Sequence, residues 1–113
     1  MANLDQIVNY VADYVTQDWT EADHKTGTAT ITIPDSAKEV FVIVNCGGTT
    51  YRGYSSVPCI GSRWELGGYY NSSSDFGICN LNVTNDGKTY SIRNAKYAGS
   101  THTSTAVIYV YYR

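Results

Sequence analysis

The stretch that decides the fold is Glu-Val-Phe-Val-Ile-Val-Asn, residues 39–45. Hydrophobic side chains occupy both odd and even positions over most of it. Successive side chains of an extended chain point to opposite faces, so both faces of this segment would be apolar. Such a strand belongs in the middle of a sheet that is covered on both sides. We therefore predict that residues 39–45 form the core strand of a β-rich domain.

A further strand is predicted just before it, in residues 28–33. Ala29, Ile31 and Ile33 alternate there with threonines. A period of two is typical of a half-buried strand, and Pro34 would end it because proline cannot donate to a sheet.

The clearest turn signal lies at Asp86-Gly87, between two β-prone runs. It predicts a tight hairpin, because glycine takes the positive φ that a primed turn demands. Residues 76–84 and 88–97 would then pair antiparallel. The terminal run, residues 104–113, is rich in β-branched and aromatic side chains and predicts the last strand. Glycines punctuate two weaker predicted strands, residues 50–57 and 63–70.

Together these signals predict a mainly β fold, an antiparallel β-sandwich or jelly-roll-like domain, preceded by one short N-terminal amphipathic helix. A chain of 113 residues has the length of one domain. We expect the helix in residues 1–17, a connector without sustained period in residues 18–27, and the sandwich in residues 28–113.

The predicted helix would begin at Asn3, which can cap it, with Gln6 reaching back as in a capping box. Its apolar stripe consists of Leu4, Ile7, Val8, Val11, Tyr14 and Val15. So short a helix is marginal alone and must bury that stripe. The spacing fits packing on its own sandwich and also a seam between chains, and we take the six residues as oligomerisation candidates.

The charge distribution bears on the choice of partner. Residues 1–39 hold seven acids and two bases, whereas residues 40–113 hold three acids and six bases. The basic half lacks the clustered Lys and Arg that neutralise many phosphates, so nucleic acid is not an expected partner. We expect no signal peptide, because residues 1–15 lack a basic start followed by an apolar run, and no membrane insertion, because no apolar run is long enough.

Motifs of catalysis and of metal binding are not recognisable in the sequence. Cys46, Cys59 and Cys79 form no C-x-x-C pair and are interpreted as buried free thiols, with one disulfide and a spare thiol as the alternative. His24 and His102 flank polar loops and are interpreted as solvated. We therefore expect no enzyme activity, no metal and no cofactor.

The candidate binding face is the aromatic and Arg-containing middle of the chain. Tyrosine and tryptophan present flat apolar faces with a polar handle, and arginine adds planar donors, a combination that suits sugar rings or protein surfaces. The alternative is that these side chains fill cross-strand and core positions. The candidates are Tyr51, Arg52, Tyr54, Arg63, Trp64, Tyr69 and Tyr70.

Residues 1–15, followed by Trp19, resemble the starts of small virion proteins of phages that infect Gram-positive bacteria. Residues 31–44 and 107–113 look like the first and last strands of sandwich domains at the tips of phage tail or head fibres. The resemblance covers about half of the chain and transfers no functional residue.

The resemblance implies a non-enzymatic structural or adhesion protein of a bacteriophage: a fibre, receptor-binding or head-decoration component. It would be made in the bacterial cytoplasm and displayed on the virion. Its expected partners are further copies of itself, with a trimer favoured, other virion proteins, and a host cell-surface glycan. The alternative from the residues alone is a monomeric carbohydrate-binding module with an aromatic face.

Overall fold

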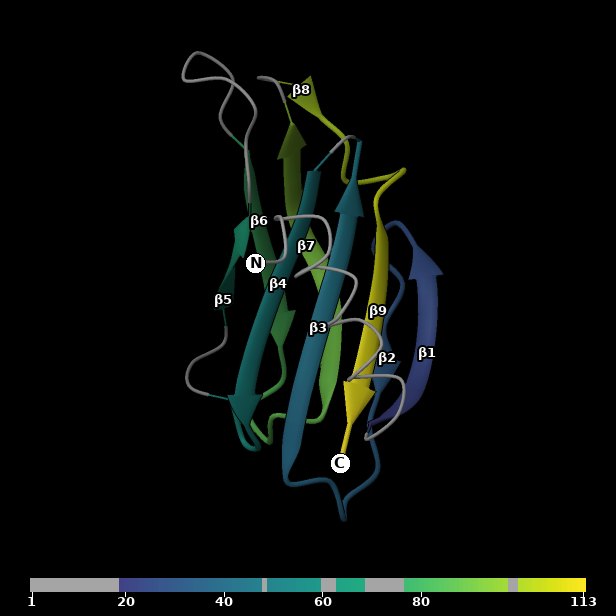
Figure 1. Cartoon of the computed structure of the whole chain (residues 1–113), viewed down its shortest axis with the longest axis vertical. Helices are drawn as coiled ribbons and strands as arrows, with labels where there is room; N and C mark the ends of the chain where they lie inside the picture. The colour runs from purple at the N-terminus through teal and green to yellow at the C-terminus, as the bar shows by residue number, and fades with distance from the viewer. Residues whose placement is uncertain (1–18, 48, 60–62, 69–76, 98–99) are drawn as a thin grey trace, which may run out of the picture.

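The computed structural model describes residues 19–47, 49–59, 63–68, 77–97 and 100–113. These residues contain nine strands and no helix (Figure 1), so the prediction of a mainly β fold is confirmed. The N-terminal helix predicted in residues 1–17 lies outside the described residues. The strands are β1 (Thr20–Thr26), β2 (Ile31–Thr32), β3 (Glu39–Cys46), β4 (Thr49–Ser56), β5 (Arg63–Gly68), β6 (Ile78–Val83), β7 (Thr89–Tyr97), β8 (Ser100–Thr101) and β9 (Val107–Tyr112).

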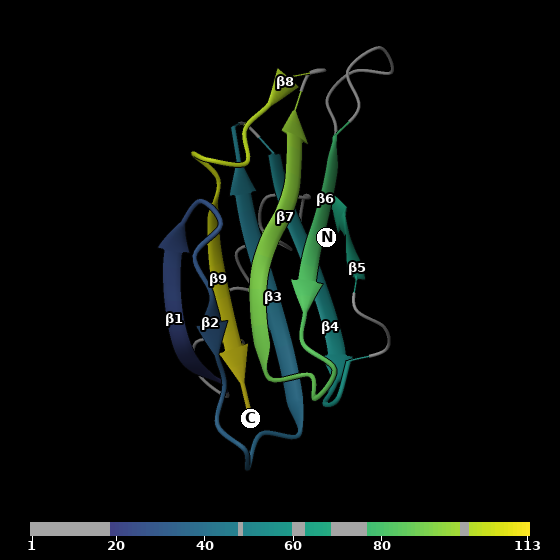
Figure 2. The same cartoon turned by 180° about the vertical axis from the view of Figure 1, so that it is seen from behind.

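The strands follow one hydrogen-bonded path, β1-β9-β3-β4-β5-β6-β7-β2, with β8 attached to β7, and every pair is antiparallel. Figures 1 and 2 show two layers: a front sheet of β1, β9, β3 and β4, and a rear sheet that includes β6, β7 and β2. Strand β5 joins the layers, pairing with β4 through only two residue pairs. The path nearly closes into a barrel, whereas the predicted sandwich would have kept two separate sheets.

The predicted core strand is confirmed as β3, which lies between β9 and β4. Val40, Val42 and Val44 are fully buried, whereas Phe41 and Ile43 point to the opposite face and are half-buried. The inner face packs against the rear sheet in one hydrophobic cluster. The strand is therefore apolar on both faces because both faces are at least partly covered.

The predicted hairpin is also confirmed, since β6 and β7 pair antiparallel, from the pair Ile78–Lys96 to the pair Val83–Tyr90. Gly87 has a φ of 70°, and its N–H donates to the Thr84 carbonyl oxygen at 2.8 Å. The turn therefore spans residues 84–87 and is centred on Asn85 and Asp86, one residue earlier than the turn predicted at Asp86-Gly87.

Residues 18–27 were predicted to be a connector, which is wrong for Thr20–Thr26 because these residues form β1 and pair with β9. The pairing register shifts between Glu21 and Asp23, a bulge that breaks the period of two. The strand also lies at one end of the hydrogen-bonded path and exposes mostly polar side chains. An interrupted, polar edge strand leaves no hydrophobic alternation to detect.

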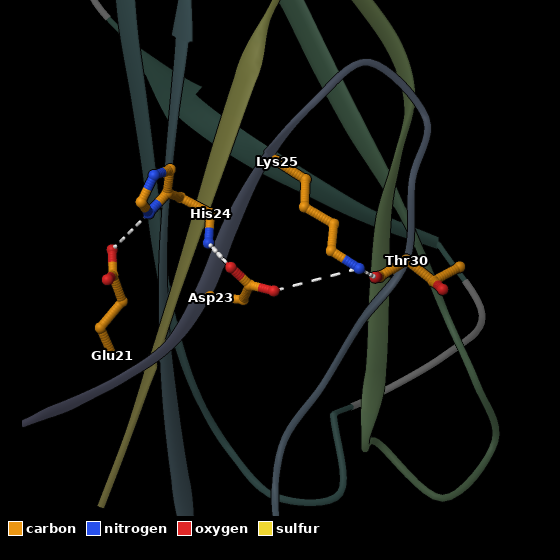
Figure 3. A network of polar contacts seen from close by, with 5 residues as sticks. All are labelled: Glu21, Asp23, His24, Lys25 and Thr30. Carbon is orange, nitrogen blue, oxygen red and sulfur yellow. Dashed lines mark hydrogen bonds and ion pairs between the residues drawn. The ribbon is translucent and has the colours of Figure 1, made fainter.

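The seam between β1 and β2 is bridged by a side chain, as Figure 3 shows. The Lys25 ammonium donates to the Thr30 carbonyl oxygen at 2.9 Å and lies 4.0 Å from the Asp23 carboxylate. Strand β2 is only two residues long, although the predicted strand covered residues 28–33. Its alternation is nevertheless real, since Ile31 and Ile33 are both buried.

Candidate functional site

The predicted binding residues do not share one face. Tyr51 points into the core with 1% of its surface exposed, and its hydroxyl donates across the barrel to the Lys96 carbonyl oxygen at 3.0 Å. Arg52, its neighbour on β4, points outward and is half-buried. Successive side chains of a strand alternate between faces, so Tyr51 cannot be part of a surface site. Its large aromatic ring is a core residue.

The remaining predicted binding residues are spread over two strands. Tyr54 on β4 is 53% exposed, Arg63 at the start of β5 is exposed, and Trp64 is half-buried. The Trp64 ring meets Tyr90 edge to face, with centroids 6.4 Å apart. Outside the described residues lie Tyr69 and Tyr70, together with the oligomerisation candidates Leu4, Ile7, Val8, Val11, Tyr14 and Val15.

Tyr54 and Trp64 are nevertheless two of the four residues that line a small pocket of about 170 Å³, together with Ser55 and Cys59. The Trp64 ring reaches this position because residue 53 is glycine. A Cβ atom on Gly53 would lie 2.6 Å from Trp64 Cζ2, far inside ordinary contact distance. Tyr54 itself points to the outer side of β4, where it packs against Trp19, whereas Trp64 packs on the inner side beneath Gly53. We call the hollow that both residues line the Tyr54–Trp64 pocket.

Tyr54 is held in place by a group that we call the terminal cluster, which consists of Trp19, Glu39, Tyr54 and Arg113. The Tyr54 hydroxyl donates to Glu39 Oε1 at 2.5 Å, and Arg113 Nε donates to Glu39 Oε2 at 2.5 Å. The Arg113 guanidinium lies 4.5 Å from the centre of the Trp19 ring, a cation–π contact. The cluster joins Trp19 to Arg113, two residues that lie far apart in the sequence.

The hydrogen bonds of the terminal cluster shift the acidity of its members. The Tyr54 hydroxyl and then Arg113 lower the pKa of Glu39 below its ordinary value. The hydrogen bond to Glu39 is also the largest of the effects that raise the pKa of Tyr54, because the Glu39 carboxylate opposes a second negative charge. The pocket therefore presents Tyr54 as a neutral phenol at physiological pH.

A second, shallower feature lies on the outer face of the front sheet. Pairing places Tyr111, Phe41 and Tyr54 in one row, and Tyr109, Ile43 and Arg52 in the next. A groove of about 230 Å³ crosses these rows; Ile43, Asn45, Thr50, Arg52, Tyr109 and Tyr111 line it. We call this surface the outer face.

The two predicted solvated histidines lie at the surface or near it. His24 is on β1, where its ring stacks on Tyr109 at 5.4 Å and Nδ1 lies 3.3 Å from Glu21 (Figure 3). His102 is half-buried and its carbonyl oxygen accepts the backbone N–H groups of Thr105 and Ala106. Among the described residues, no three His, Cys, Asp or Glu side chains group as a metal site would require.

Sequence reasoning missed the residues that build the outer face. Trp19 was assigned to a connector, although it is 7% exposed and packs edge to face on Phe41 and Tyr54. Tyr109 and Tyr111 were assigned to the last strand without a role. Their alternation with the buried Ile108 and Val110 was the available signal, since it places both tyrosines on the face away from the core.

The three cysteines are buried free thiols, as predicted. Burial raises the pKa of Cys46, and it raises that of Cys79 to about 12, with a smaller contribution from Cys46. In the described part of the chain, no helix is long and apolar enough to cross a membrane. Comparison with protein-family models, with curated proteins and with solved structures found no match.

Proposed function

We propose that this protein is a non-enzymatic adhesion module that binds carbohydrate at the Tyr54–Trp64 pocket. The observation that carries the proposal is that Tyr54 on β4 and Trp64 on β5 line the same hollow of about 170 Å³. Aromatic faces pack against the C–H faces of sugar rings, and a small polar complement fixes their orientation. The Ser55 hydroxyl at the pocket supplies one polar group of this kind.

The pocket is partly preorganised for such contacts. Tyr54 is tethered by its bond to Glu39, and Trp64 is wedged between Gly53 and the core. Side chains that are already ordered lose little entropy when a ligand arrives. At about 0.3 kcal/mol per non-hydrogen atom, a single hexose would gain roughly 4 kcal/mol, which corresponds to a Kd of about 1 mM. We expect tighter binding only for longer oligosaccharides.

The test is an NMR titration of the ¹⁵N-labelled full chain with a panel of mono- and oligosaccharides at millimolar concentration. We expect a hit to shift the resonances of Tyr54, Ser55 and Trp64. Tyr54→Ala should abolish binding, whereas Tyr54→Phe, which keeps the ring, should retain most of it. Trp64→Phe should weaken binding while preserving the core contact with Tyr90.

The matched control is Tyr109→Ala, which removes a tyrosine ring from the outer face at a residue that does not line the pocket. It should leave the titration unchanged. A panel without any response at the pocket would refute the proposal, as would a saccharide that binds the Tyr54→Ala variant with the affinity of the unaltered chain.

We propose a bacteriophage particle as the setting of this adhesion role, with the protein acting as a fibre, receptor-binding or head-decoration component. The support is the resemblance of residues 1–15, 31–44 and 107–113 to phage virion proteins. A gene that lies among capsid, portal or tail genes would favour the proposal. The trimer that the resemblance favours is tested by light scattering, and a strict monomer at micromolar concentration would count against it.

A further inference from the structure

We infer that the N-terminal segment, residues 1–18, docks on the outer face of its own front sheet and occupies the groove at Ile43, Arg52, Tyr109 and Tyr111. The groove shares no lining residue with the Tyr54–Trp64 pocket, although Tyr54 also contacts Trp19 on the outer face. The outer face is an interaction surface of the barrel, and its occupant is the stretch of chain that precedes Trp19.

Trp19 anchors the start of the described chain on the outer face. Trp19 immediately follows the segment, and its ring is buried on the outer face against Phe41 and Tyr54, each with a centroid distance of 6.0 Å. Arg113 covers the same ring from another side. The segment therefore leaves the described barrel from a point that is anchored on this face.

The outer face is rich in aromatic and branched apolar side chains. Phe41, Ile43, Tyr109 and Tyr111 point away from the core, yet each is only partly exposed. An outward row of aromatic and branched side chains costs free energy in water and marks a surface that another element covers. The groove of about 230 Å³, which is lined in part by Ile43, Tyr109 and Tyr111, has room for apolar side chains.

The sequence of the segment supplies a matching element. Residues 3–16 carry the apolar stripe described above, and a helix of this length would extend about 21 Å. Strand β3, with eight residues, extends about 26 Å, so the stripe and the face have comparable lengths. The segment has three aspartates and no Lys or Arg, whereas Arg52 in the groove has no ion pair or hydrogen bond among the described residues. The charges are complementary.

Tethering favours the same chain over a second copy. The segment is joined to the face through Trp19, so its effective concentration there is on the order of millimolar for a short link. A second copy would need to reach that concentration in solution to compete. The stripe then serves the fold of one chain, and a trimer would have to form through another surface than Leu4, Ile7, Val8, Val11, Tyr14 and Val15.

The test uses the full chain labelled with ¹³C and ¹⁵N. We expect nuclear Overhauser contacts between the methyl groups of Ile7, Val8 or Val11 and the rings of Tyr109 and Tyr111. In a one-to-one mixture of labelled and unlabelled chains, an isotope-filtered experiment separates contacts within a chain from contacts between copies. The filtered spectrum should lack these contacts. Their absence from the unfiltered spectrum, or their presence in the filtered one, would overturn the inference.

Two variants with the same added charge sharpen the test. Val8→Asp places a carboxylate on the stripe, and Asn9→Asp places one beside it. We expect Val8→Asp to shift the Tyr109 and Tyr111 resonances and to abolish the contacts, while Asn9→Asp leaves both unchanged. Equal effects of the two variants would contradict docking through the stripe. The measurement on the unaltered chain decides the matter even if a variant fails to fold.

Discussion

Glu39 occupies a position where one carboxylate connects three parts of the chain. It accepts hydrogen bonds from Tyr54 on β4 and from Arg113 at the end of the chain, and Arg113 in turn covers Trp19. In addition, the backbone N–H of Glu39 donates to the Arg113 carbonyl oxygen, and the backbone N–H of Arg113 donates to the Glu39 carbonyl oxygen. A residue with these contacts orients Tyr54 at the candidate pocket and Trp19 on the outer face.

The lowered pKa of Glu39 predicts an acid-dependent loss of stability. A carboxyl whose folded pKa lies below its ordinary value of 4.5 stabilises the fold fully above that pH, and the effect is lost as the pH falls through the folded pKa. We expect Glu39→Gln to lower the Tm by a constant amount between about pH 7 and pH 5, where Glu39 is ionised. Below about pH 4.5 the difference should shrink.

Thermal unfolding followed by circular dichroism, with the two proteins measured side by side, gives this difference at each pH. Using the difference removes the contribution of Asp86, whose pKa is also lowered, chiefly by the Thr84 hydroxyl. A gap in Tm that widens towards acid pH would show that Glu39 does not act through its ionised form.

At the scale of strands, the junction of β4 and β5 depends on two glycines that differ in surroundings. A Cβ atom on Gly53 would lie 2.5 Å from Leu66 Cδ2 and 2.6 Å from Trp64 Cζ2. A Cβ atom on Gly67 would meet only the Arg52 carbonyl oxygen, at 4.0 Å. Packed side chains therefore leave no space for a Cβ atom at residue 53, whereas residue 67 has space for one.

We therefore predict that Gly53→Ala destabilises the fold by about 1–3 kcal/mol through overpacking, because the rigid Trp64 ring must move. Gly67→Ala should change stability by less than about 1 kcal/mol, and in the stabilising direction if the backbone suits alanine. Urea unfolding at equilibrium measures both. Equal losses for the two variants would mean that loss of glycine itself, and not the space beneath residue 53, is responsible.

At the scale of the whole molecule, one core joins the two layers. Val42 and Ile108 of the front sheet and Leu81 and Ile92 of the rear sheet belong to a single buried cluster. Tyr51 spans the layers with its bond to the Lys96 carbonyl oxygen. Because the layers share their core, we expect the barrel to unfold as one unit.

The buried thiols report on that cooperativity. Cys46 and Cys79 are fully buried, and Cys59 is 8% exposed. With its pKa raised to about 12, Cys79 is a protonated, unreactive thiol near neutral pH. We predict that a thiol reagent at about pH 8 modifies Cys59 first, and that it reaches Cys46 and Cys79 only at the rate of global opening.

Mass spectrometry of digested samples, taken over time, assigns the modified residue. In denaturant all three thiols should react together, as expected of free cysteines. Rapid modification of Cys79 under native conditions would reveal a local opening of β6 that a single cooperative core does not allow.

The parts of the fold that were predictable share one property: their signal is local. The alternation of Ile31 and Ile33, the doubly apolar run of β3 and the glycine of the β6–β7 turn each follow from the backbone geometry of a few neighbouring residues. Strand β1 was missed because a bulge and a polar edge remove that local pattern. The candidate site was predicted only in part: Tyr54 and Trp64 were named as binding residues, but so was Tyr51, which is buried. No local pattern shows which of these side chains reach the surface.

The sequence by itself therefore determined that this chain forms antiparallel strands and where most of them run, whereas it left open whether two of its cysteines pair. Only the tertiary structure decided that the strands follow one nearly closed path, that Tyr51 lies inside, and that Tyr54 and Trp64 line one pocket. The physical reason is that alternation tells which residues share a face of a strand, but not which face is turned towards the core or which strands become neighbours. Those choices depend on packing between segments that are distant in the chain.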